Sequence, residues 1–123
     1  MTDKGDLDGL LGPLEAEVMR IVWSAKSPVT PREVLDQLNA ARKAALAYTT
    51  VMTVMSRLTE KDVLLRSRAR RGYAYVPAVR TAAELAVRGV MRDFGEAAVA
   101  HFVTEAQANP RLRRRLERLL REH

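Results

Sequence analysis

The chain of 123 residues has no cysteine, two histidines (His101 and His123) and an aromatic content of 5%. Without cysteine there can be no disulfide bond and no cysteine-ligated metal site. Two histidines cannot form a zinc site unless several carboxylates join them. We therefore expect no metal ion and no other cofactor.

Long hydrophobic runs are also missing, because no apolar stretch approaches the roughly 18 residues that span a bilayer. Residues 1–10 hold three Asp and one Lys, whereas a signal peptide starts with a basic and then an apolar region. We predict a cytoplasmic protein without membrane insertion, and a flexible N-terminal arm over residues 1–10. The sequence also shows no nucleophile paired with a base and no glycine-rich phosphate loop, so we predict that it is not an enzyme.

Basic charge is what the sequence has in excess. The net charge is +6 and the isoelectric point is about 10.3. Residues 57–71 hold six Arg or Lys against two acidic residues, and residues 110–122 hold six Arg against two Glu. Two such clusters are typical of a protein that binds a polyanion, most simply nucleic acid, although charge alone fits a solvated arginine-rich surface equally well.

Start signals predict two helices in the first 40 residues. Gly12-Pro13 opens the first, because proline at the first helical position loses no hydrogen bond. Thr30 and Glu33 form a capping box around Pro31 and open the second.

The stretch AYTTVMTVMSRL predicts a third helix, from Ala47 or Tyr48 to about Lys61. It does not alternate as a strand would, and a rotation of 100° per residue separates an apolar face from a hydroxyl face. The apolar face holds Val51, Val54, Met55 and Leu58. The outer face holds Thr49, Thr53 and Ser56, with Met52 and Arg57 at its sides.

The next stretch, DVLLRSRARRGYAYV, changes to a period of two and predicts a β-hairpin. Gly72 marks the bend, since it tolerates positive φ, and Pro77 ends the second strand. The tip of this hairpin is rich in arginine. The order of three helices and a hairpin predicts a winged helix-turn-helix over residues 11–79, in a mostly α fold with a small antiparallel β wing.

This fold predicts binding to double-stranded DNA, with the third helix in the major groove and the wing along the phosphates. Arginines suit phosphate oxygens, whereas hydroxyls and methyl groups can contact base edges. The DNA-binding residues predicted in this way are Thr30, Arg32, Tyr48, Thr49, Met52, Thr53, Arg57, Arg66, Arg68, Arg70, Arg71 and Tyr73. A winged helix used only for protein contacts, without a specific DNA site, is the alternative.

Residues 80–123 predict three more helices that form a dimerisation domain. Three short helices cannot build a core of their own, and a second copy of the chain is the simplest cover for their apolar faces. A two-fold dimer would bind an inverted-repeat operator. Folding back onto the chain's own winged domain and, for the basic last helix, a membrane surface are the alternatives. The predicted dimerisation residues are Val87, Val90, Met91, Phe94, Val99, Phe102, Val103, Leu112, Leu116, Leu119 and Leu120.

Four stretches resemble successive blocks of the penicillinase-repressor family, the BlaI/MecI type: LGPLEAEVMRIVWS, TPREVLDQL, AYTTVMTVMSRLTEKDVL and RGYAYVP. The resemblance runs from about Leu11 to Leu120. It implies a bacterial homodimeric repressor of β-lactam resistance genes that binds palindromic operators through its winged helix. By position, the resemblance places DNA contacts at Thr49, Thr50, Met52, Thr53 and Arg57.

The resemblance further implies release from DNA by proteolysis, after a membrane sensor protease detects a β-lactam. The matching stretch is VAHFVTE, with the scissile bond between His101 and Phe102. Members of the staphylococcal type have Asn where this chain has His101, which also fits an ordinary helix residue near a dimer interface. A copper-responsive branch carries C-terminal cysteine pairs, which this chain lacks.

Overall fold

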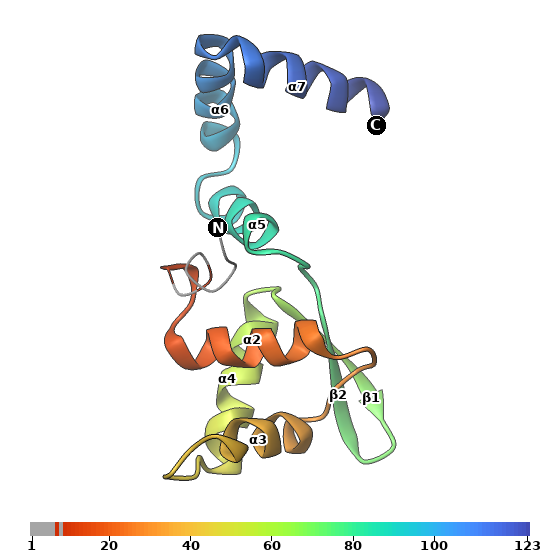
Figure 1. Ribbon diagram of the computed structural model, residues 1–123. Coiled ribbons are helices and arrows are strands. Elements are labelled where there is room, and N and C mark those ends of the chain that lie inside the picture. The colour runs from red at the N-terminus through yellow and green to blue at the C-terminus, as the bar shows by residue number, and fades with distance from the viewer. Residues whose placement is uncertain (1–6, 8) are drawn as a thin grey trace. The chain divides into compact units, whose positions relative to one another are not determined.

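The computed structural model describes residue 7 and residues 9–123. From Pro13 onward, the described chain forms three helices, then a hairpin, then three more helices (Figure 1). Their bounds are α2 Pro13–Ser24, α3 Pro31–Ala40, α4 Tyr48–Glu60, β1 Leu64–Ala69, β2 Gly72–Pro77, α5 Ala82–Phe94, α6 Glu96–Ala108 and α7 Pro110–Glu122. The predicted fold class, mostly α with one small antiparallel β wing, is confirmed.

The chain divides into two compact units, Met1–Leu85 and Ala86–His123. We predicted the boundary between residues 79 and 80, a few residues earlier. The predicted arm over residues 1–10 lies outside the described residues except at positions 7, 9 and 10. Among these three, Leu7 is helical and fully buried in the core of the first unit.

The helix starts follow the predicted capping chemistry. The Thr30 hydroxyl accepts a hydrogen bond from the Glu33 N–H, and the Glu33 carboxylate accepts one from the Thr30 N–H at 2.9 Å. This reciprocal box satisfies two backbone donors that the first turn of α3 leaves unpaired. At the start of α2, where Gly12 has no side chain to contribute, the Glu15 carboxylate accepts from the Gly12 N–H at 3.2 Å.

The core of the first unit forms around α4, which packs against α2, α3 and β1. All four residues of its predicted apolar face are buried: Val51, Val54, Met55 and Leu58. Trp23, near the end of α2, donates a hydrogen bond from its indole N–H to the Val79 carbonyl at 2.7 Å. That bond ties the chain leaving β2 to the end of α2.

The strands β1 and β2 form a two-stranded antiparallel sheet in which Leu64 faces Pro77 and Ala69 faces Gly72. Arg70 and Arg71 form the turn between them, and Gly72 has the positive φ of 106° that its lack of a side chain permits. Val29 adds a one-residue bridge to Tyr75 through two backbone hydrogen bonds. The hairpin is therefore bonded to the segment that leads into α3.

The second unit has almost no interior of its own. Of its residues, all of which the structure describes, only Ala106 is buried. Local features set the ends of its helices. Gly95 follows the end of α5 and has a positive φ of 56°. The Asn109 side chain caps α7 by accepting hydrogen bonds from the Arg111 and Leu112 N–H groups. Within residues 7 and 9–123, no helix combines the length and the apolar character needed to cross a membrane.

Two leucines test this account of the core. Leu58 on α4 has no exposed surface, whereas the Leu65 side chain on β1 is 55% exposed. We expect Leu58→Ala to lower the free energy of unfolding by about 3 kcal/mol, because it leaves a cavity. The same change at Leu65 should cost within about 0.5 kcal/mol. Urea denaturation measures both values, and equal losses would contradict the assignment of α4 to the core.

Candidate nucleic-acid interface

The outer face of α4 is open to solvent, as predicted from its periodicity. Thr49, Thr50, Thr53 and Arg57 are exposed, and Met52 is half-buried. The face opposite the core therefore presents hydroxyl and methyl groups with one cation, Arg57, in the last turn. Such a surface has the size and chemistry to contact base edges in a major groove.

Thr53 has a defined hydrogen-bonding polarity. Its hydroxyl donates to the Thr49 carbonyl one turn earlier, at an Oγ1–O distance of 2.9 Å. Because that bond uses the only hydroxyl proton, the oxygen can offer just its lone pairs to an outside partner. In a DNA groove, acceptors of this kind pair with the amino group of adenine or cytosine.

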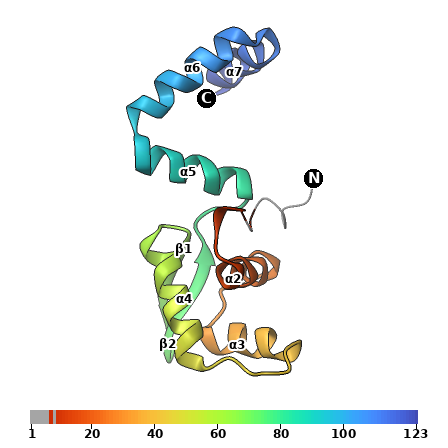
Figure 2. The ribbon, with the colours of Figure 1, turned by 90° about the vertical axis from the view of Figure 1, so that its left-hand side faces the viewer.

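A depression of about 220 Å³ lies between the start of α3, the start of α4 and the hairpin. In Figures 1 and 2 these three parts meet at one end of the unit. The depression brings together six of the predicted DNA-binding residues: Thr30, Arg32, Tyr48, Met52, Arg71 and Tyr73. Among the residues that the structure describes, no carboxylate lines it, and the charged side chains that do are cationic.

Two arginines at this end stack on tyrosine rings. The Arg32 guanidinium lies 4.9 Å from the centre of the Tyr48 ring, and the Arg66 guanidinium lies 4.4 Å from the centre of the Tyr73 ring. Each ring holds its cation by a cation–π interaction without neutralising it. Both arginines therefore keep their N–H donors and their charge available for an anion.

The arginines of the hairpin are exposed and have no carboxylate partner among the described residues: Arg66, Arg68, Arg70 and Arg71. Arg70 and Arg71 occupy the turn itself, and Arg68 pairs across the sheet with Tyr73. Unpaired guanidinium groups on a protruding hairpin form a surface that suits phosphate oxygens.

A second depression, of about 440 Å³, separates the start of α2 from the outer face of α4. Gly12 and Pro13 line it on one side, and Thr50, Thr53 and Arg57 on the other. Thr49, Arg68 and Arg70 line neither depression. Sequence reasoning did not assign Gly12 and Pro13 to this surface, because only the crossing of α2 over α4 brings them there.

The predicted dimerisation residues lie in the second unit, in positions that leave most of them uncovered. The α5 and α6 residues are exposed: Val87, Val90, Met91, Phe94, Val99, Phe102 and Val103. On α7, Leu112, Leu116 and Leu119 are half-buried and Leu120 is 69% exposed.

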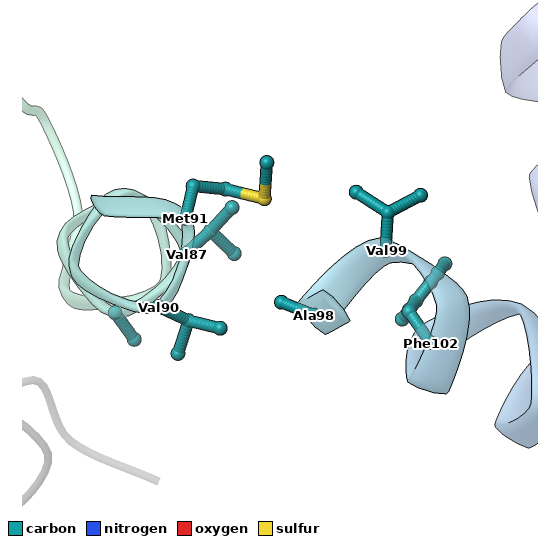
Figure 3. Close-up of a pocket in the computed structure, with 7 residues that line it drawn as sticks. Val87, Val90, Met91, Ala98, Val99 and Phe102 are labelled. Carbon is teal, nitrogen blue, oxygen red and sulfur yellow. The ribbon is translucent and has the colours of Figure 1, made fainter. Parts of the chain in front are cut away.

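An apolar groove of about 370 Å³ runs between α5 and α6. Val87, Val90 and Met91 point toward Val99 and Phe102 across this groove (Figure 3). The groove is an unfilled apolar surface on a small protein, the kind of surface that marks an interaction site. His101 and Phe102, the residues matched to a cleavage site, are both exposed within α6.

The fold of the first unit and its basic hairpin define the class of this protein, a winged helix-turn-helix regulator. The model of the penicillinase repressor family matches residues 11–122. The chain belongs to this family, as its sequence blocks predicted. It is therefore a transcriptional regulator that binds DNA rather than an enzyme.

Two curated relatives agree with this membership. The transcriptional regulator BlaI of Mycobacterium tuberculosis, in strains CDC 1551 and H37Rv, is 42% identical over an alignment of 124 positions, and this alignment covers 92% of this chain and 87% of the relative. A solved structure of the ferric uptake regulator Fur of Helicobacter pylori aligns with a TM-score of 0.54 at 16% identity. That alignment covers 65% of this chain and 60% of the Fur chain and supports the fold alone.

One buried polar atom lies beneath the interface and gives a test of its packing. Tyr75 lines the first depression and is 1% exposed, and its hydroxyl has no hydrogen-bond partner among the described residues. An unpaired buried hydroxyl costs about 1–3 kcal/mol. Tyr75→Phe should therefore raise the free energy of unfolding by about 1 kcal/mol in thermal denaturation. Tyr73→Phe on the exposed hairpin is the control and should change stability little, whereas a less stable Tyr75→Phe protein would refute the packing.

Proposed function

We propose that this protein is a sequence-specific transcriptional repressor that binds inverted-repeat operators in double-stranded DNA as a homodimer. The observation that carries the proposal is the pairing of an exposed hydroxyl face on α4 with an adjacent hairpin of unpaired arginines. The M. tuberculosis relatives are named as transcriptional regulators, which supports the same role here.

The two surfaces divide affinity from specificity. Phosphate contacts from Arg68, Arg70 and Arg71 hold any duplex, because the backbone is the same at every sequence. The neutral face of α4 then discriminates bases: the Thr53 oxygen accepts from an amino group and its methyl contacts thymine. The first depression is lined by Thr30, Arg32, Tyr48 and Tyr73. These side chains hold α4 against the DNA backbone.

The groove of the second unit supports the dimer. Its lining is apolar, and the half-buried leucines of α7 continue the apolar surface of the unit. A second copy would cover these side chains by a two-fold interface, in which each patch meets its own equivalent. The resulting pair of α4 helices would read two half-sites, so the operator is an inverted repeat.

The regulated genes in this proposal are β-lactamase and other β-lactam resistance genes, in keeping with the family. Repression ends when the dimer is lost, either by dissociation or by proteolysis at His101–Phe102. This bond lies inside α6 (Glu96–Ala108), so a protease such as a membrane sensor must first unwind that helix locally. Cutting there would separate α7 from α5 and remove part of the apolar groove.

Substitutions at Thr53 test the base-reading role. Thr53→Val keeps the methyl group and replaces the hydroxyl with a second methyl, so it should lose about 1 kcal/mol of discrimination at one base pair, the contribution of a single hydrogen bond. Thr53→Ser keeps the oxygen and should weaken only a preference for thymine. Selection of binding sites from randomised duplexes measures both changes. If Thr53→Val loses affinity equally for selected and random DNA, the assignment fails.

The hairpin provides the contrasting variant. Arg70→Gln combined with Arg71→Gln should weaken binding to every sequence by a similar factor, because these side chains contact phosphates. Because the proposed dimer carries two hairpins and so loses four phosphate contacts, the slope of log affinity against log salt should become shallower by about 4, at about 0.9 per contact. A titration of affinity against salt measures this slope. A wild-type protein that protects no duplex at low salt would instead favour a winged helix used only for protein contacts.

The dimer has its own test. Phe102→Glu places a charge in the apolar groove and should shift the protein from dimer to monomer, because burying an unpaired carboxylate is costly. Leu65→Glu adds the same charge at another exposed apolar side chain, outside the groove, and should leave the dimer intact. Sedimentation velocity distinguishes the two states. A dimeric Phe102→Glu protein would show that the groove is not the interface.

A further inference from the structure

The arginines of α7 have no part in the surfaces described so far. This helix, Pro110–Glu122, holds six Arg and two Glu, and all six arginines are exposed. The winged helix already has cations at its hairpin, and the dimer needs only the leucines of α7. Because neither surface uses these arginines, we ask which anionic partner they could bind.

The helix separates its two chemistries on opposite faces. With about 100° between successive residues, the leucines fall within an arc of about 100° and five of the arginines within an arc of about 120° on the other side. The arginines in that arc are Arg111, Arg114, Arg115, Arg118 and Arg121. On the leucine side, Leu112, Leu116 and Leu119 are half-buried, and α7 packs against α6.

Glu122 falls within the arc of these arginines, but the structure shows no ion pair between them in the described part of the chain. Among the described residues, none of the six arginines forms an ion pair with a carboxylate, although Glu117 and Glu122 lie on the same helix. Arg111 and Arg115, and likewise Arg114 and Arg118, stand four residues apart, where like charges destabilise a helix. An external anion would relieve this repulsion.

The geometry fits a polyanion with closely spaced phosphates. Guanidinium groups bind phosphate oxygens in a bidentate manner and stay charged at any physiological pH. From Arg111 to Arg121 the helix rises about 15 Å. Over that length a DNA duplex presents about nine phosphate charges, more than enough for every arginine in the row.

We propose that the arginine face of α7 is a second, sequence-independent binding surface for duplex DNA. The proposal rests on the proposed function, since it takes the partner to be the polyanion that α4 and the hairpin bind. An anionic membrane fits less well, because α7 has no aromatic residue and three of its four leucines are already half-buried within the chain.

The test uses the full-length chain and a pair of matched variants. Arg114→Gln with Arg118→Gln removes two charges from the row, and glutamine keeps a high helix propensity. Lys26→Gln with Arg80→Gln removes two exposed charges outside both basic clusters. Fluorescence anisotropy measures affinity for a random duplex of about 40 base pairs, or four helical turns, across a range of salt.

Because the proposed dimer carries two α7 helices, we expect the α7 variant to lose four contacts and to make the log–log salt slope shallower by about 4, and the control variant to leave it unchanged. Arg114→Lys with Arg118→Lys keeps the charge and should retain most of the slope. An equal loss in the control would make the effect one of net charge and overturn the proposal.

Two further outcomes separate this inference from the proposed function. If the α7 variant keeps the wild-type slope while Arg70→Gln with Arg71→Gln lowers it, the inference fails and the repressor role stands. If the wild type binds no duplex, both fail. Loss of binding to phosphatidylserine vesicles with an unchanged DNA slope would identify α7 as a membrane site and also overturn the proposal.

Discussion

The burial of one face of α4 is the constraint on which the rest of the first unit depends. Val51, Val54, Met55 and Leu58 fill the core, so the helix cannot rotate without exchanging them for threonines. The hydroxyl face is thereby fixed outward. The same burial positions the hairpin. Val63 lies between the end of α4 and the start of β1, and its N–H donates to the Leu58 carbonyl. The same buried residues thus hold both α4 and the hairpin in place.

The features that could be predicted from the sequence are those with local causes. The cap of α3 needs only residues three positions apart, and the buried face of α4 needs only its period. The stacking of Arg32 on Tyr48 depends on how α3 crosses α4, which no periodicity encodes. Nor could the sequence decide that Leu64 is buried and Leu65 exposed, because a shift of one residue exchanges the two faces of a strand.

The two units solve the problem of burial differently. In the first unit, three helices and a hairpin enclose their apolar side chains. In the second, the helices are too short to surround one another, and residues such as Phe94 and Phe102 remain exposed. A unit of this kind leaves apolar surface that a second molecule could cover. In the proposed dimer, the folding and the association of this unit would be coupled, so that opening α6 would also weaken the dimer.

In the proposed function, neutral groups on α4 would discriminate bases without adding affinity for every sequence, so the affinity would have to come from elsewhere. Arginines supply it at any sequence, and too many of them beside α4 would hold the protein on random DNA. The proposed dimer would avoid this conflict, because linking two α4 helices would raise the effective concentration of the second helix only at a matched half-site. A cationic α7 would then speed the search for the operator and would leave the selection of the operator sequence unchanged. Sequence-independent contacts let a protein slide along DNA before it reaches its operator.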